Sequence, residues 1–175
     1  AELKESNRRA VLIITDPVIA EQPFIKDIVV QLEQTGIKTA VFDRVEANPK
    51  DRNVTEAAAK AAEMKVDAIL AVGGGSPIDC AKAVSVVAAL GGKVREYEDS
   101  SNINGPVLPL FTVPTTAGTG SEVTFSSVIT DTSEQFKFTI KSPNIAPETA
   151  YIDPLYTHSM PPMLTAATGL DALTH

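Results

Sequence analysis

The sequence predicts an α/β fold in which an open, mostly parallel sheet carries helices on both faces. From residue 10 to residue 113, apolar runs typical of buried parallel strands alternate with segments of helical periodicity. Strands and helices that alternate in this way favour right-handed crossovers and therefore a parallel sheet. The chain has 175 residues, of which 43% are hydrophobic, which is enough for one core-bearing domain and hardly for two.

Each expected element follows from its apolar spacing. An uninterrupted apolar run indicates a strand covered on both faces, whereas Phe24, Ile28 and Leu32 illustrate the spacing of a helix, with Gly36 as a typical helix end. In order, the expected elements are a strand at 10–15, a helix at 23–34, a strand at 37–42, an Ala-rich helix at 54–64, a strand at 68–72, a helix at 77–90 and a strand at 107–113.

Beyond residue 113 the pattern changes from regular alternation to short β-rich segments. In order, these residues predict a loop of small residues at 115–121, a hairpin of two strands at 123–130 and 136–140, a short strand at 149–152 and a helix from about Met163. Prolines at positions 161 and 162 mark the change from sheet to helix. We therefore expect an α/β domain at 1–160 and the first helix of a second domain at 161–175.

Charge and cysteine content exclude several classes of protein. Lys and Arg number 15 against 22 Asp and Glu, and the net charge of −7 disfavours binding to nucleic acid or to an anionic membrane surface. No apolar run approaches the roughly 18 residues of a membrane-spanning helix, and a single cysteine excludes an internal disulfide. The charged start, with no apolar signal region behind it, favours a cytoplasmic protein, and the missing initiator Met indicates an excerpt of a longer one.

The strongest local motif is the glycine-rich turn VGGGSPID at residues 72–79. It follows an expected strand at the carboxyl end of the sheet, where open α/β folds bind ligands. Ser76 suits the N-cap of the next helix and Pro77 its first position, which leaves free N–H groups directed at an anion such as a pyrophosphate. The alternative is a tight turn with a well-capped helix. The spacing is not that of the Rossmann fingerprint.

Asp16 ends the first expected strand and is a candidate for binding ribose. A carboxylate there accepts hydrogen bonds from ribose hydroxyls and repels a 2′-phosphate, which favours NAD over NADP. An Asp-Pro turn with Pro17 is the alternative. Asp43, at the end of the second strand, competes for the same role, and position alone does not separate the two.

Further polar residues are candidates with local alternatives. The hydroxyls in the loop after the fourth strand suit phosphate, ribose or amide groups, or belong to an ordinary polar loop; they are those of Thr115, Thr116, Thr119 and Ser121. Lys137 suits a phosphate or ribose, or is a solvated strand lysine.

Asp171 and His175 share one helical face, where both could bind one cation, although this spacing is common by chance. His158 is expected to face water. Cys80 is expected to be a small buried side chain, with an activated thiol as the alternative.

Taken together, three motifs resemble those of the iron-containing (group III) alcohol dehydrogenases. They lie at residues 73–79, 114–122 and 166–175, and the resemblance extends over essentially the whole chain. It implies an N-terminal α/β cofactor domain of the dehydroquinate synthase-like type followed by an all-helical C-terminal domain. It also implies NAD as cofactor, Fe²⁺ or sometimes Zn²⁺ as metal, a small alcohol or aldehyde as substrate, and a homo-oligomeric full-length enzyme.

The resemblance also implies roles for individual residues. Asp16 would meet the adenosine ribose and Asn48 the adenine, and the pyrophosphate loop would comprise Gly74, Gly75, Ser76 and Asp79. Further cofactor contacts would come from Thr115, Thr116, Thr119 and Lys137. Asp171 and His175 would be the first two of four metal ligands, the other two being histidines of the helical domain. The isolated chain is therefore expected to lack turnover. The alternatives are a nucleotide-binding module and a zinc-dependent relative of glycerol dehydrogenase.

Overall fold

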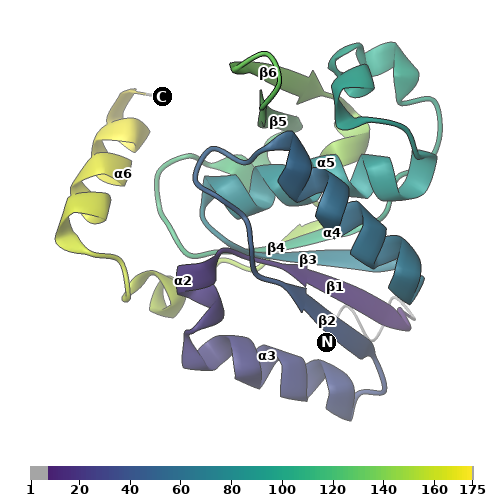
Figure 1. Cartoon of the computed structure of the whole chain (residues 1–175). Helices are drawn as coiled ribbons and strands as arrows, with labels where there is room; N and C mark the ends of the chain where they lie inside the picture. The colour runs from purple at the N-terminus through teal and green to yellow at the C-terminus, as the bar shows by residue number, and fades with distance from the viewer. Residues whose placement is uncertain (1–7, 175) are drawn as a thin grey trace.

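The computed structural model describes residues 8–174 and contains a five-stranded, fully parallel sheet (Figure 1). The strand order is β2-β1-β3-β4-β7. The strands are β1 (Ala10–Ile14), β2 (Lys38–Phe42), β3 (Ala68–Gly73), β4 (Leu110–Pro114) and β7 (Thr149–Ala150). The predicted α/β class and parallel sheet are confirmed.

Helices cover both faces of this sheet, as predicted. The α-helices are α2 (Pro17–Ala20), α3 (Pro23–Gln34), α4 (Asp51–Met64), α5 (Gly75–Leu90) and α6 (Pro162–Thr174). In Figure 1, α3 lies on one face of the sheet and α4 and α5 lie on the other. Alternate residues of β1 therefore enter two cores: Leu12 and Ile14 pack on the α4–α5 side, and Val11 and Ile13 pack on the α3 side.

The predicted hairpin forms a separate two-stranded sheet. β5 (Ser126–Asp131) pairs antiparallel with β6 (Phe136–Lys141). Short 3₁₀ turns complete the chain; they are η1 (Val94–Glu98), η2 (Ser100–Asn102), η3 (Ser121–Val123), η4 (Pro143–Ile145) and η5 (Pro154–Thr157). The hairpin lies near α5, on the side of the main sheet that α4 and α5 cover (Figure 1).

Several expected bounds differ from the observed ones for local chemical reasons. α4 begins at Asp51, three residues earlier than expected, because Asn53 Oδ1 accepts the Lys50 N–H at 2.9 Å and stabilises an earlier start. β4 begins only at Leu110, since Pro109 has no N–H to donate to a neighbouring strand. The short helix α2 was not expected; the Asp16 side chain caps it.

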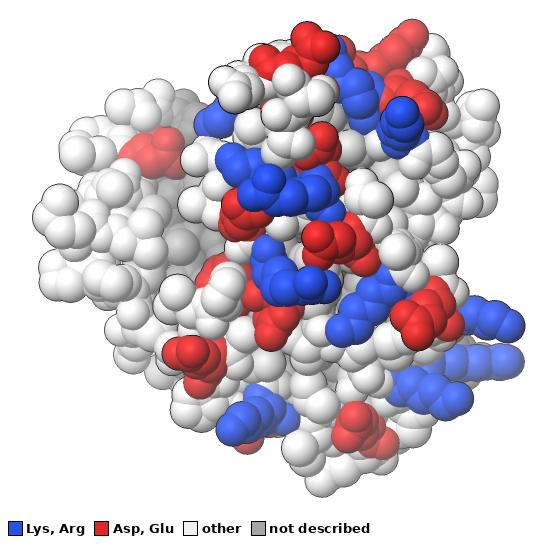
Figure 2. Space-filling view, in the orientation of Figure 1, with Lys and Arg blue, Asp and Glu red and all other residues white. Residues whose placement is uncertain are grey.

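The helix α6 begins close to the expected residue and stands at the margin of the sheet domain (Figure 1). None of its residues 162–174, all of them described, is buried. Met163 and Leu173 are each 82% exposed and Leu170 is 64% exposed. Figure 2 shows charged side chains of both signs across the middle of the molecule and very few over α6. Within residues 8–174, no helix has the length and apolar character needed to cross a membrane.

Candidate functional site

The glycine-rich turn joins β3 to α5 at the carboxyl edge of the sheet. Gly73 has a φ of +153°, and a Cβ built on it would lie 2.6 Å from Pro77 Cγ, so a side chain has no room there. Gly74 is the N-cap, and among the described residues no side chain caps the helix. The amide groups of the first turn of a 16-residue helix are thus left for a ligand.

The prediction that Ser76 caps this helix is wrong. The helix begins at Gly75, so Ser76 lies inside the first turn. Its Oγ accepts a hydrogen bond from the Asn48 N–H at 3.2 Å instead of bonding to the helix. The alternative interpretation of the turn required a well-capped helix, and the uncapped start favours an anion site.

The loop of small residues at 115–121, which we call the threonine loop, follows β4 and lies directly against the glycine turn. A Cβ built on Gly74 would meet Thr116 Cγ2 at 3.0 Å, and one built on Gly75 would meet Thr119 Oγ1 at 3.1 Å. The Thr115 N–H donates to the Gly73 carbonyl at 3.0 Å, which continues the β3–β4 pairing past the strand ends. Two hydroxyl-bearing side chains and the amides of the helix start therefore share one edge of the sheet.

Asp16 lies at the same edge, one strand away. Its Oδ1 accepts hydrogen bonds from the Val18 and Ile19 N–H groups, both at 2.9 Å, so the Asp-Pro turn of the alternative interpretation is formed. Its Oδ2 accepts no hydrogen bond from residues 8–174, so that oxygen is available to a ligand. Asp43 follows β2 at the far side of β1 and is exposed.

Asn48 and Lys137 meet beside the glycine turn although they are distant in sequence. Lys137 Nζ donates to Asn48 Oδ1 at 2.6 Å. Asn48 has a left-handed backbone, with φ at 52°, and its N–H donates to Ser76 Oγ. The hairpin and the segment after β2 thus converge on the start of α5. Asn48, Ser76 and Lys137 therefore lie in one cluster.

Asp79 contacts the hairpin through hydrogen bonds rather than facing the turn with free oxygens. Its carboxylate accepts from Ser121 Oγ at 2.6 Å and from the Val128 N–H at 3.0 Å. Burial raises the pKa of the Asp79 carboxyl, against these hydrogen bonds and the Lys82 charge, which lower it. A pyrophosphate contact from Asp79 stays a prediction.

Two buried polar residues were missed by the sequence reasoning. Lys82 is fully buried, and burial lowers the pKa of its ammonium to about 8. Its signal was a charged residue among the apolar residues that follow Asp79 in α5. Thr15 ends up buried at the carboxyl end of β1, and its Oγ1 has no hydrogen-bond partner within residues 8–174. Nothing in the sequence distinguishes Thr15 from an ordinary core residue of a strand.

The remaining candidates are less informative. Burial raises the pKa of the Cys80 thiol, so it is an inert core side chain and not an activated one. His158 is exposed, as expected. Asp171 lies on α6, whereas His175 lies outside the described residues. Within 8–174, no three His, Cys, Asp or Glu residues are grouped as a metal site.

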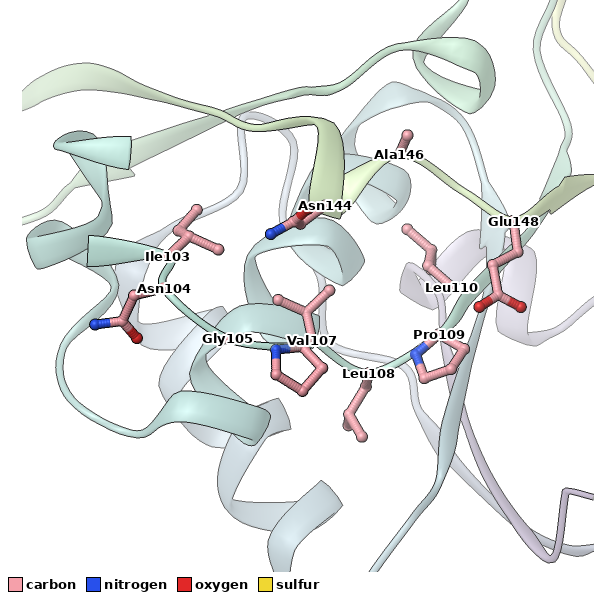
Figure 3. Close-up of a pocket in the computed structure, with 11 residues that line it drawn as sticks. Ile103, Asn104, Gly105, Val107, Leu108, Pro109, Leu110, Asn144, Ala146 and Glu148 are labelled. Carbon is pink, nitrogen blue, oxygen red and sulfur yellow. The ribbon is translucent and has the colours of Figure 1, made fainter. Parts of the chain in front are cut away.

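A pocket of about 580 Å³ lies at the opposite, amino edge of the sheet. Figure 3 shows the segment 103–110 along one side of it and the chain that carries Asn144, Ala146 and Glu148 along the other. Its lining residues lie just before or at the start of β4 and before β7, whereas the glycine turn and the threonine loop follow the ends of β3 and β4. Of the described lining residues, Glu148 alone is titratable. This pocket is therefore separate from the candidate site.

Comparison with known proteins relates the chain to one enzyme family. The family model described as iron-containing alcohol dehydrogenase matches residues 1–154. Alcohol dehydrogenase 4 of Saccharomyces cerevisiae is 38% identical over 173 residues, which cover 99% of this chain and 45% of that protein. The NAD-dependent methanol dehydrogenase of Bacillus methanolicus is 35% identical over the same shares of the two chains.

Solved structures agree with this relationship. The crystal structure of a 1,3-propanediol oxidoreductase superposes with a TM-score of 0.93 at 38% identity, covering 99% of this chain and 46% of that one. The chain thus spans less than half the length of the relatives it matches.

Proposed function

Since this chain belongs to the iron-containing alcohol dehydrogenase family, we propose that it is the NAD-binding part of an enzyme that transfers hydride between a small alcohol or aldehyde and NAD. The observation that carries the proposal is the uncapped start of α5 at Gly74, against which the threonine loop packs. Free amides at a helix N-terminus suit the diphosphate of a dinucleotide, because partial positive charge and N–H donors coincide there.

The glycine turn and Asp16 would hold different parts of the cofactor. The amides of Gly75 and Ser76 would bind the diphosphate, while Asp16 Oδ2 would accept a hydrogen bond from the adenosine ribose. A carboxylate at that position repels a 2′-phosphate, which supports NAD over NADP. The Bacillus methanolicus relative is described as NAD-dependent, in agreement with this preference.

The residues around the turn would complete the cofactor site. Asn48 would lie near the adenine, with Lys137 holding its side-chain amide through the 2.6 Å hydrogen bond. Thr115, Thr116 and Thr119 would line the side toward α6. Their loop contacts α6 directly, since a Cβ built on Gly118 would lie 2.6 Å from the Thr168 carbonyl oxygen. The hydride-accepting end of the cofactor would therefore lie near α6.

We propose that Asp171 and His175 supply two ligands of a divalent metal, Fe²⁺ or alternatively Zn²⁺. A bound metal supplies Lewis acidity that lowers the pKa of an alcohol hydroxyl. Two ligands are fewer than the three that a catalytic metal site normally keeps, and the family resemblance implies that two histidines of a helical domain would supply the others. The division at residues 160 and 161 is part of the same proposal, supported by the exposed Met163 and Leu173 of α6, which a further domain would cover.

A nucleotide-binding module without turnover is the second candidate, because the described residues hold no complete metal site. A zinc-dependent relative of glycerol dehydrogenase is the third, and metal analysis of the longer protein decides between iron and zinc. On the resemblance to this family alone, we further propose that the full-length enzyme is cytoplasmic and homo-oligomeric.

The decisive experiment is a calorimetric titration of the chain with NADH, paired with an assay of alcohol oxidation on the same preparation. We expect the chain to bind NADH with measurable heat but to show no turnover. We expect turnover once the helical domain that the family resemblance implies is added. Turnover by the chain alone would contradict the need for outside ligands. A chain that releases no heat with NADH would overturn the proposed cofactor site.

A further inference from the structure

We propose that Lys82 is a positioning residue for the cofactor, because its buried ammonium holds the threonine loop over the glycine turn. The inference rests on the proposed function and adds to it a residue that lies away from the glycines and would act on the cofactor only through the threonine loop. Lys82 lies on α5, two turns after the uncapped helix start, and its side chain has 0% exposure.

The Lys82 ammonium joins α5 to the chain segment that follows the threonine loop. Nζ donates to the carbonyl oxygens of Ser121 at 2.7 Å and Ser126 at 2.9 Å. It also lies 2.8 Å from Thr124 Oγ1 and 3.0 Å from Ser121 Oγ. One side chain therefore fixes both ends of the segment 121–126, which connects the loop to β5.

Asp79 completes the network one helical turn earlier. Ser121 Oγ donates to Asp79 Oδ1 at 2.6 Å, which leaves that hydroxyl oxygen free to accept from Lys82 Nζ. Lys82 Nζ lies 3.9 Å from the same carboxylate oxygen. Ser121 is thus bound by two charged side chains from one face of α5, so its position relative to the helix start is rigidly set.

The same serine is linked to the residues that pack on the glycine turn. The Ser121 N–H donates to Thr119 Oγ1 at 3.3 Å, and Thr119 packs over Gly75. A buried ammonium costs solvation free energy, and an apolar side chain would fill this space without that cost. Unlike an apolar residue, Lys82 donates hydrogen bonds to the loop. These bonds fix Ser121, and Ser121 in turn fixes Thr119.

The test compares Lys82→Met with Lys60→Met. Lys60 is the matched control because its Nζ donates to the Val41 carbonyl at 2.7 Å, on α4 and away from the loop. Binding of NADH and of adenosine monophosphate is measured by calorimetry. We expect Lys82→Met to weaken NADH binding about tenfold while adenosine monophosphate binding stays within about twofold, because the loop faces the half of the cofactor beyond the adenosine. Lys60→Met should bind both ligands as the unsubstituted chain does.

Two results would overturn the inference: unchanged NADH affinity in Lys82→Met, or an equal loss for both ligands, which indicates general destabilisation. If Lys82→Met does not fold, Ser121→Ala decides the question, since it removes the hydroxyl that joins Asp79, Lys82 and the loop. It should weaken NADH binding at least threefold and leave adenosine monophosphate binding unchanged. Failure of the unsubstituted chain to bind NADH overturns the proposed function, whereas unchanged binding by the variants overturns this inference only.

Discussion

The Lys137 ammonium donates a hydrogen bond to the Asn48 side-chain oxygen at 2.6 Å, across 89 residues of sequence. Lys137 comes from the hairpin, and Asn48 from the segment between β2 and α4. The Asn48 carbonyl also accepts from Thr130 Oγ1 at 3.4 Å, so both hairpin strands contact this residue. In the proposed site, the hairpin would therefore close the side that binds the adenosine.

Replacing Lys137 with methionine should weaken NADH binding about threefold. An exposed hydrogen-bonded contact contributes up to about 1 kcal/mol, and its loss frees the Asn48 amide to rotate. Calorimetric titration of the variant measures the change. Lys141→Met, on the same strand but without a hydrogen bond to Asn48, is the control and should bind normally.

Replacing Asp16 with asparagine should relax the discrimination against NADPH. The amide keeps an oxygen that can cap α2, so the fold is retained, whereas the charge that repels a 2′-phosphate is lost. We expect the ratio of NADPH to NADH affinity to rise about tenfold. The parallel variant Asp43→Asn separates the two carboxylates: a change in that variant, with none in Asp16→Asn, would transfer the role to Asp43.

Gly75→Ala should weaken NADH binding at least about tenfold. The added Cβ would lie 3.1 Å from both Thr119 Cγ2 and Thr119 Oγ1, and it would occupy space beside the amides proposed to bind diphosphate. Gly169→Ala is the control, because a Cβ there meets nothing within 4 Å.

The double variant Gly75→Ala/Thr119→Ser distinguishes the two possible causes of this loss. It removes the Thr119 methyl group and so relieves part of the crowding, but it leaves the new Cβ beside the amides. We expect no recovery of NADH binding. Full recovery would mean that displacement of the loop, and not blocked access to the amides, caused the loss.

The stability contributed at position 82 should rise with pH. Burial lowers the pKa of Lys82 from 10.5 to about 8, while the charges of Asp79 and Glu122 oppose that shift. Between about pH 8 and pH 10.5 the unfolded chain binds more protons than the folded chain. The contribution of Lys82 to the free energy of unfolding therefore increases with pH. Over this range the increase is at most about 3 kcal/mol.

Denaturant unfolding of the unsubstituted chain and of Lys82→Met, at pH 7 and at pH 10, measures this effect. From pH 7 to pH 10, the free energy of unfolding of the unsubstituted chain should rise relative to that of Lys82→Met. Titration of other groups affects both proteins equally and cancels in this difference. A difference independent of pH would show that Lys82 keeps an ordinary pKa in the fold.

His175→Ala, made in the longer protein that includes the helical half, should abolish metal retention and turnover while NADH still binds. The glycine turn lies on a different element from α6, so loss of a metal ligand leaves the diphosphate contacts in place. Elemental analysis and NADH titration of the purified variant report on the two sites separately. Retained metal would exclude His175 as a ligand.

Local pattern was sufficient for most of the fold and for the position of the candidate site. The apolar run of β1, the periodicity of α3 and the glycine turn each depend on residues close together in sequence. The cap of α5 could not be predicted in this way. Ser76 has the right chemistry for an N-cap, but its hydroxyl bonds to Asn48, which a different part of the chain brings to it.

By itself, the sequence determined the alternation of strands and helices, the hairpin and the small-residue turns, since backbone preference and apolar spacing act over a few residues. Only the tertiary structure decided that Lys137 meets Asn48, that Asp79 is bound by the hairpin and that Lys82 is buried against the end of the threonine loop. The physical reason is that hydrogen-bond partners of buried polar groups are chosen by strand order and packing, and these bring together residues about 40 to 90 positions apart.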